Sequence, residues 1–304
     1  VVRNLASVRA LRTVEEVEVF EQADAVSEAG ARLHAMSLTG LTLDHWRTLD
    51  RDTATRCAEE AAHRVDGRFV RLDAAPHLGG APHRALIERA GATYALIPGG
   101  TVTVGFDAEA WQPPPEQLAS YREESLAGGF GFDEDPRDHL ARVMSPRRTA
   151  TLPTVLMAVR AAPLPGAPDL VPGLLAERGL RLPSPEEWEH ACGAGATTLF
   201  HWGDAYPSDT VPYGTDGTGP HRLPNALGLR VAFDVYDSAE LTSDPRSVYG
   251  GDGGEAACGG YGTFLEWLPL ATAHRSRSMA DLLDDQEDEE ACAYVTARPV
   301  IDLS

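Results

Sequence analysis

Residues 181–195 read RLPSPEEWEHACGAG and carry a full set of signals for one short helix. Ser184 is a favourable N-cap residue, and Glu187 stands three positions later, the spacing of a capping box. Trp188 begins a set of apolar side chains at helical spacing, which we expect to be buried together. Gly193 then ends the helix. These signals predict a local structure and, taken alone, no chemistry.

The region before residue 90 has a helical pattern. Apolar residues recur at helical spacing within 13–37 and again within 42–65, where we expect a break near Asp50. We therefore predict a mainly helical N-terminal region over residues 1–90.

The sequence pattern changes from helical to strand-and-loop at about residue 91. Residues 92–107 are rich in β-branched side chains around a Pro-Gly-Gly sequence and read as strand, turn, strand. Short strands and long Gly-, Pro- and Asp-rich loops follow, apart from the helix at 185–193. We predict an α+β protein with an irregular, loop-rich domain at residues 91–304.

Composition excludes some classes of function. The formal net charge is −20, and this acidic total argues against a nucleic-acid binder, which needs a basic surface. All 26 basic residues are arginine. No run of 18 apolar residues predicts a membrane span, and the N-terminus has no apolar signal region. We therefore expect a cytoplasmic protein that binds neither membranes nor nucleic acids.

The helix at 185–193 and the sequence LFHWGDAYPSD that follows it resemble a signature of the formylglycine-generating enzyme family, also called sulfatase-modifying factors. Further similar segments occur in the order that this family has. They are YALIPGGTVTVGFD at 94–107, PNALGL at 224–229, FLEWLPLA at 264–271 and ARPVID at 297–302. The resemblance covers about residues 91–304 and implies a variant of the C-type lectin fold.

The resemblance also implies what this chain lacks. Enzymes of the family oxidise a cysteine of their substrate by using copper held by two closely spaced cysteines, because soft thiolates select Cu(I). The corresponding segment here, ATAHRSRSMADLL at 271–283, has Ala273 and Ser278 at the two cysteine positions. The four cysteines of the chain (Cys57, Cys192, Cys258 and Cys292) form no close pair. We predict no formylglycine-generating activity.

Two groups of residues are candidates for binding a peptide or small ligand in the cleft. The first comprises His201, Trp202, Glu266 and Trp267, whose equivalents border the cleft in the family. The alternative interpretation is structural: His201 at the surface, Trp202 packed on Trp188, and Glu266 paired with Arg181. The second group is His274 and Arg275, which suit an anionic or carboxylate ligand. Alternatively, Arg275 and Arg277 neutralise the acidic run that follows them.

A glycine-rich insertion at residues 230–260 separates two of the similar segments. Its Asp252 and Glu255 are candidate oxygen ligands of a hard cation such as calcium, although their spacing does not match an EF-hand. The alternative is a surface loop turned by its glycines.

Three functions therefore remain open. The first is a catalytically silent relative whose cleft binds a peptide or small ligand. The second is a metal-dependent enzyme of altered chemistry, such as an oxidase or a sulfoxide synthase that binds iron through His34, His45 and His63. The third is an interaction module whose N-terminal helices dock a partner. The sequence indicates neither a substrate nor an oligomeric state.

Overall fold

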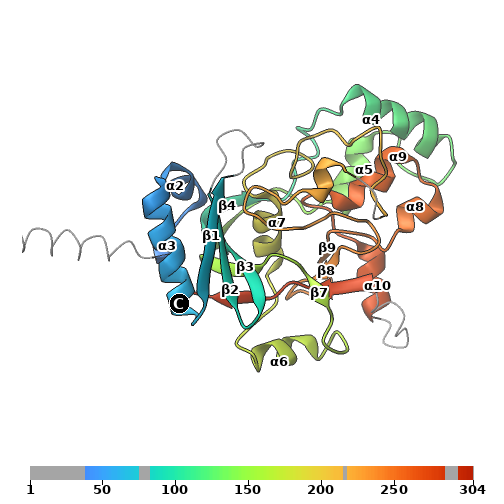
Figure 1. Ribbon diagram of the computed structural model, residues 1–304. Helices are drawn as coiled ribbons and strands as arrows, with labels where there is room; N and C mark the ends of the chain where they lie inside the picture. Colours follow the sequence, from blue (N-terminus) through green and yellow to red (C-terminus); the bar gives the residue numbers. More distant parts are fainter. Residues whose placement is uncertain (1–37, 75–82, 215–217, 285–293, 304) are drawn as a thin grey trace, which may run out of the picture. The chain divides into compact units, whose positions relative to one another are not determined.

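The computed structural model describes residues 38–74, 83–214, 218–284 and 294–303 (Figure 1). The chain separates into two compact units, Val1–Ser37 and Leu38–Ser304. The first unit, which contains the helical pattern at 13–37, lies outside the described residues. The described helices and strands all belong to the second unit.

Helix α7 (Pro185–Gly193) forms as its sequence predicts. The Ser184 hydroxyl accepts from the Glu187 amide at 3.1 Å, and the Glu187 carboxylate accepts from the Ser184 amide at 2.8 Å. This reciprocal pair is the predicted capping box. The next residue, Ala194, adopts the left-handed conformation with φ of 49°, which stops the helix.

Three β-sheets form the framework of the described residues. The largest is antiparallel and has the strand order β1-β2-β3-β6-β11. A second sheet has the order β7-β10-β8-β9, with β10 and β8 parallel, and the third is the antiparallel pair β4-β5. The strands are β1 (Arg68–Ala74), β2 (His83–Arg89), β3 (Ala92–Ile97), β4 (Gly100–Val104), β5 (Arg148–Leu152), β6 (Val155–Ala158), β7 (Ala162–Pro163), β8 (Ala239–Leu241), β9 (Val248–Tyr249), β10 (Val295–Ala297) and β11 (Val300–Asp302).

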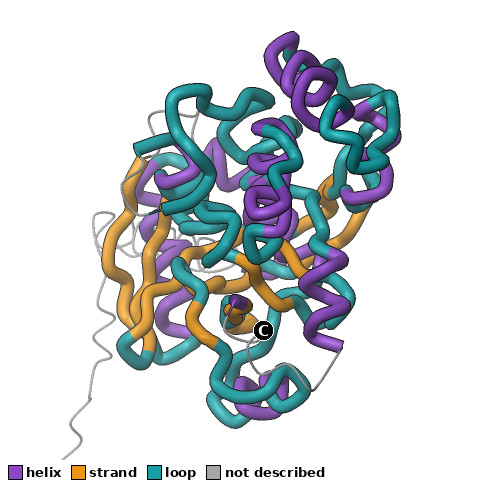
Figure 2. The backbone as a smooth tube through the Cα atoms, turned by 90° about the vertical axis from the view of Figure 1, so that its right-hand side faces the viewer, coloured by secondary structure: helices purple, strands orange, loops and turns teal. Residues whose placement is uncertain are grey.

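The remaining helices, apart from α3, are short, and loops connect them (Figure 2). They are α2 (Leu43–Thr48), α3 (Arg51–Arg64), α4 (Pro115–Ser120), α5 (Pro136–Val143), α6 (Val171–Ala176), α8 (Glu255–Gly259), α9 (Thr263–Trp267) and α10 (Arg277–Asp284). Three short 3₁₀ turns, η1 (Leu38–Gly40), η3 (Pro220–Arg222) and η4 (Leu268–Leu270), and a π-helix, η2 (Tyr121–Leu126), complete the set. The described part is thus α+β and loop-rich. None of its helices is both long and apolar enough to cross a membrane.

The predicted division at residue 90 is wrong for the described part of the chain. Helices α2 and α3 form with a break at Leu49–Asp50, as expected, and the Asp50 carboxylate caps α3. The residues after α3, however, form strands β1 and β2, and β2 pairs with β3 in a hairpin closed by Ala90 and Gly91. Helix α3 lies against β1 and β2 (Figure 1). The large sheet therefore crosses the predicted boundary, because β1 and β2 precede residue 90 whereas β3, β6 and β11 follow it.

Candidate functional site

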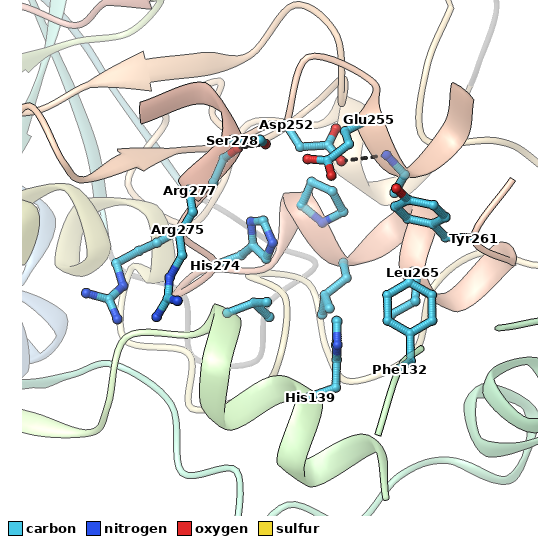
Figure 3. Close-up of a pocket in the computed structure, with 15 residues that line it drawn as sticks. Phe132, His139, Asp252, Glu255, Tyr261, Leu265, His274, Arg275, Arg277 and Ser278 are labelled. Atoms are coloured by element: carbon cyan, nitrogen blue, oxygen red, sulfur yellow. Dashed lines mark hydrogen bonds between the residues drawn. The ribbon is translucent and has the colours of Figure 1, made fainter. Parts of the chain in front are cut away.

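A pocket of about 220 Å³ lies where helices α5, α8 and α9 approach the segment that leads into α10 (Figure 3). Four stretches of chain supply its lining side chains, within residues 132–143, 252–256, 261–269 and 274–278. The lining combines aromatic and aliphatic side chains with two carboxylates, two imidazoles and two guanidinium groups. Tertiary contacts between distant segments create this pocket.

Four of the eight predicted site residues line the pocket. They are Asp252, Glu255, His274 and Arg275. The sequence assigned them to two separate sites, an acidic loop for a cation and a basic point for an anion. The structure brings both pairs into one cavity.

Two other predicted residues, His201 and Trp202, do not line the pocket. His201 is buried, with 5% of its surface exposed, so the expectation of a surface histidine is wrong. Trp202 stacks on Phe200 with ring centroids 4.6 Å apart. The expected contact between Trp202 and Trp188 is also wrong, because Trp188 stacks on Tyr249 at 4.8 Å.

Trp267 belongs to an aromatic cluster next to the pocket lining. Its ring is fully buried and lies 4.8 Å from the His221 ring and 6.1 Å from the Tyr206 ring, measured between centroids. This packing makes Trp267 a core residue that fixes α9, and its neighbour Leu265 lines the pocket.

Glu266 is half-buried on the same helix. Partial burial and the nearby Glu124 carboxylate raise its pKa. The predicted partner, Arg181, is wrong. Its guanidinium pairs instead with Glu187 at 2.6 Å and with Asp302 at 2.7 Å, which ties α7 to β11.

Asp252 is buried at the start of the turn that leads into α8. Its carboxylate accepts from the Gly254 amide at 2.8 Å. It also accepts from the Ala256 amide at 3.0 Å, which Figure 3 shows as a dashed line. Desolvation raises the pKa of Asp252 to about 6, although these two hydrogen bonds act in the opposite direction. Asp252 thus holds the loop in shape while it faces the cavity.

Glu255 is exposed at the first position of α8 and reaches the same cavity. No group of three or more His, Cys, Asp or Glu side chains in the described residues could hold a metal ion. The geometry therefore gives no support to the calcium site expected at Asp252 and Glu255. His45 and His63 are exposed on α2 and α3, and His34 lies outside the described residues.

His139 and His274 are two buried imidazoles in the pocket lining. Burial lowers the pKa of His139 to about 4 and that of His274 to about 3, and their mutual repulsion adds to the shift of His274. Both rings are therefore neutral at pH 7. The Nδ1 atom of each has no hydrogen-bond partner within the described part of the chain. Sequence reasoning missed His139, because only the fold brings α5 next to residue 274.

Arg275 and Arg277 extend on one side of the pocket (Figure 3). The Arg275 guanidinium makes one long hydrogen bond, 3.4 Å, to the Met144 carbonyl. Among the described residues neither arginine forms an ion pair, and Arg277 does not pair with Asp281 one turn later on α10. The alternative in which these arginines neutralise the acidic run is therefore not seen in the described part of that run.

The positions of the expected cysteine pair are occupied as the sequence implies. Ala273 is buried, and Ser278 lines the pocket with its hydroxyl 3.2 Å from that of Ser276. Cys57 and Cys192 are buried elsewhere as free thiols, and Cys258 is exposed on α8. No thiol among the described residues lines the pocket. This lining does not fit Cu(I), which prefers thiolate ligands.

An aromatic wall closes the other side of the pocket. Phe132 and Tyr261 both line it, with ring centroids 5.3 Å apart, and Phe132 also contacts His139. Phe130 packs on Tyr261 at 5.1 Å and remains 45% exposed. Phe130 and Phe132 lie within LAGGFGFDEDP at residues 126–136, one of the Gly-rich stretches for which the sequence predicts only a loop.

The π-helix η2 positions this side of the pocket. The Glu124 carboxylate accepts from the Thr263 amide and from the Ser120 hydroxyl, which in turn accepts from the Phe264 amide. Burial alone would raise the pKa of Glu124, but these hydrogen bonds lower it overall. They satisfy free amides at the start of α9, so η2 and α4 set where α9 presents Leu265.

Comparisons with known proteins add no assignment. No protein-family model matches this chain, and a search of curated proteins finds no significant match. The site itself therefore has to carry any conclusion about function.

Proposed function

We propose that this chain is a divergent relative of the formylglycine-generating enzymes, with their C-type-lectin-like fold, whose pocket binds a peptide or small ligand. We also propose that it does not catalyse copper-dependent oxidation of cysteine. The proposal is carried by one observation: the pocket is built on residues 274–278, next to the expected copper-binding positions, and holds neutral imidazoles and unpaired charges in place of thiols.

Contacts between the similar segments support the fold proposal. Asn225, in the PNALGL segment, is fully buried and its Nδ2 donates to the carbonyls of Ala191 and Cys192 at 2.7 and 2.9 Å. Its Oδ1 accepts from the Leu227 and Leu229 amides. Two segments of the resemblance are thus joined at the end of α7, which gives a physical reason for an asparagine at this position.

The ARPVID segment also has a structural reason. Its Arg298 is buried against Glu240, and Glu240 accepts from the Trp188 indole of α7. Val300 forms a bridge with Arg181, just before α7. The helix that carries the strongest resemblance is therefore held by two other segments that resemble the same family.

Metal content and turnover test the negative part of the proposal. Purified protein, loaded with Cu(I) and then desalted, should retain no stoichiometric copper by plasma mass spectrometry. It should also not oxidise a peptide that contains CxPxR. Stoichiometric copper together with turnover would overturn the proposal.

Ligand binding tests the positive part. A screen of amino acids, dipeptides and longer peptides by ligand-observed NMR should find compounds that the pocket binds. The variant Ser278→Trp fills the pocket from α10 and should abolish their signals, whereas Ser208→Trp, at an exposed loop position, should not. Binding that persists in Ser278→Trp would place the ligand elsewhere.

A second function, proton-transfer catalysis in the same pocket, is favoured by Asp252. Its carboxyl, whose pKa is about 6, can donate or accept a proton near neutral pH, and the neutral His274 ring beside the cavity can hydrogen-bond to the bound compound. Binding alone predicts no chemical change in a bound compound. Product formation that is lost in His274→Gln would favour the enzyme.

A further inference from the structure

We infer that the pocket recognises a small zwitterion of amino-acid size, with its carboxylate at Arg275 and Arg277 and its ammonium group at Glu255 and Asp252. This inference rests on the proposed function, because it names the ligand class of that same pocket. Its basis is that the pocket lining contains two arginines and two carboxylates that do not pair with each other.

The two arginines supply the anion-binding end. Both line the pocket, and neither forms an ion pair among the described residues. A guanidinium group presents paired donors that match the two oxygens of a carboxylate. In Figure 3 the two guanidinium groups lie on the same side of His274, away from Asp252 and Glu255.

Two carboxylates supply the cation-binding end. Asp252 and Glu255 face the cavity side by side, and neither forms an ion pair in the described part of the chain (Figure 3). Each Asp252 oxygen accepts one backbone amide, which leaves further lone pairs for an ammonium group. If these acids reached Arg275 or Arg277, the pocket would neutralise itself. Because they do not, it offers opposite charges to one ligand at two places.

The remaining lining sets the size and character of the ligand. A cavity of 220 Å³ holds about nine non-hydrogen atoms, since one of about 150 Å³ holds benzene, which has six. This volume suits one amino acid better than an extended peptide. Phe132 and Tyr261 form an apolar wall beyond the charged groups, which suits an aromatic or aliphatic side chain.

The buried histidines favour a polar ligand in the pocket. His274 has 8% of its surface exposed, lines the cavity, and leaves Nδ1 without a partner in the described structure. A buried polar atom without a partner is costly, so such atoms concentrate where a ligand or ordered water completes them. A polar ligand between the two charged ends would lie next to this ring.

Binding of three matched probes tests the inference. L-Phenylalanine carries both charges, 3-phenylpropanoate lacks the ammonium group, and 2-phenylethylamine lacks the carboxylate. By titration calorimetry we expect L-phenylalanine to bind at least about tenfold more tightly than either analogue, because each charged contact contributes about a factor of ten or more. The other nineteen amino acids are measured in parallel to identify the preferred side chain.

Variants assign the two ends. Arg275→Gln or Arg277→Gln should weaken the binding of L-phenylalanine and 3-phenylpropanoate but leave the binding of 2-phenylethylamine unchanged. Glu255→Gln should weaken the binding of L-phenylalanine and 2-phenylethylamine but leave the binding of 3-phenylpropanoate unchanged. The matched controls Arg246→Gln and Glu109→Gln change exposed residues that do not line the pocket and should change nothing.

The outcomes separate this inference from the proposed function. Equal binding of all three probes, or binding of long peptides without any amino acid, would overturn the zwitterion and retain a ligand-binding pocket. Absence of binding by every amino acid, peptide and analogue would overturn both. The charge-selective pattern in the arginine and glutamate variants would establish the inference.

Discussion

The Arg298 guanidinium lies against the Glu240 carboxylate in the interior, with Nη2 2.5 Å from Oε1 and Nε 2.7 Å from Oε2. Neither side chain has any exposed surface. The remaining guanidinium donors reach the carbonyls of Ala158 and Arg230, and the Trp188 indole donates to Glu240. This ion pair therefore joins β6, β8, β10 and α7 at one point.

Removing one partner of this pair should be strongly destabilising. Glu240→Ala leaves the Arg298 charge buried without a carboxylate, and we expect it to lower the free energy of unfolding by about 3–5 kcal/mol. Urea unfolding measures this, with Glu88→Ala as the control because the Arg68–Glu88 pair is exposed. The control should cost less than about 1 kcal/mol. Equal losses would contradict a central role for the buried pair.

Asn225 should be intolerant of even an isosteric change. In Asn225→Asp the two carbonyls that now accept from Nδ2 would face a carboxylate oxygen, so both would lose their donor. We expect a loss of about 3 kcal/mol in the free energy of unfolding at pH 7, since each buried unpaired group costs about 1–3 kcal/mol. Circular dichroism during urea titration measures it. A smaller loss for Asn225→Asp than for Asn225→Ala would show that the Oδ1 contacts dominate.

Acid should destabilise the protein through its neutral histidines. An unfolded histidine has a pKa near 6.5, whereas that of His139 is about 4 in the fold, so between these values only the unfolded state binds the proton. The stabilisation is complete above pH 6.5 and is lost as the pH falls towards 4. Asp252 acts in the opposite sense, because its raised pKa makes the folded state bind a proton between about 6 and 3.8.

The variant His139→Gln isolates one of these contributions. From pH 7 to pH 5 we expect the wild type to lose about 2 kcal/mol more stability than this variant, by the linkage of one proton. Unfolding in urea at the two pH values measures the difference. Parallel pH profiles for both proteins would show that His139 is not held neutral in the fold.

The three described thiols should differ in reactivity. Burial raises the pKa of Cys57 and Cys192, so both should resist alkylation by iodoacetamide in the native protein. Cys258 is exposed and should react. Peptide mapping by mass spectrometry distinguishes the sites, and alkylation after denaturation supplies the control. Rapid native labelling of Cys192 would contradict the packing of α7.

Much of the pocket could not be read from the sequence. Asp252, Glu255, His274 and Arg275 stood out as chemically able residues, but nothing local indicated that the two pairs share one cavity. His139 carried no signal at all, because its role depends on where α5 lies. The sequence suggested that His201 and Trp202 border a cleft. In the structure their rings contact each other, Trp202 also stacks on Phe200, and neither residue lines the pocket.

Local hydrogen bonds explain what the sequence determined by itself. Helix α7 and the break between α2 and α3 depend on caps whose partners, Ser184 with Glu187 and Asp50 with Thr53, stand three residues apart. Such contacts need only residues at that spacing and no distant segment of the chain. The sheet that crosses residue 90, the Glu240–Arg298 pair and the pocket depend on segments far apart in the chain. Only the tertiary structure decided them, because burial and strand pairing are set by which distant surfaces meet.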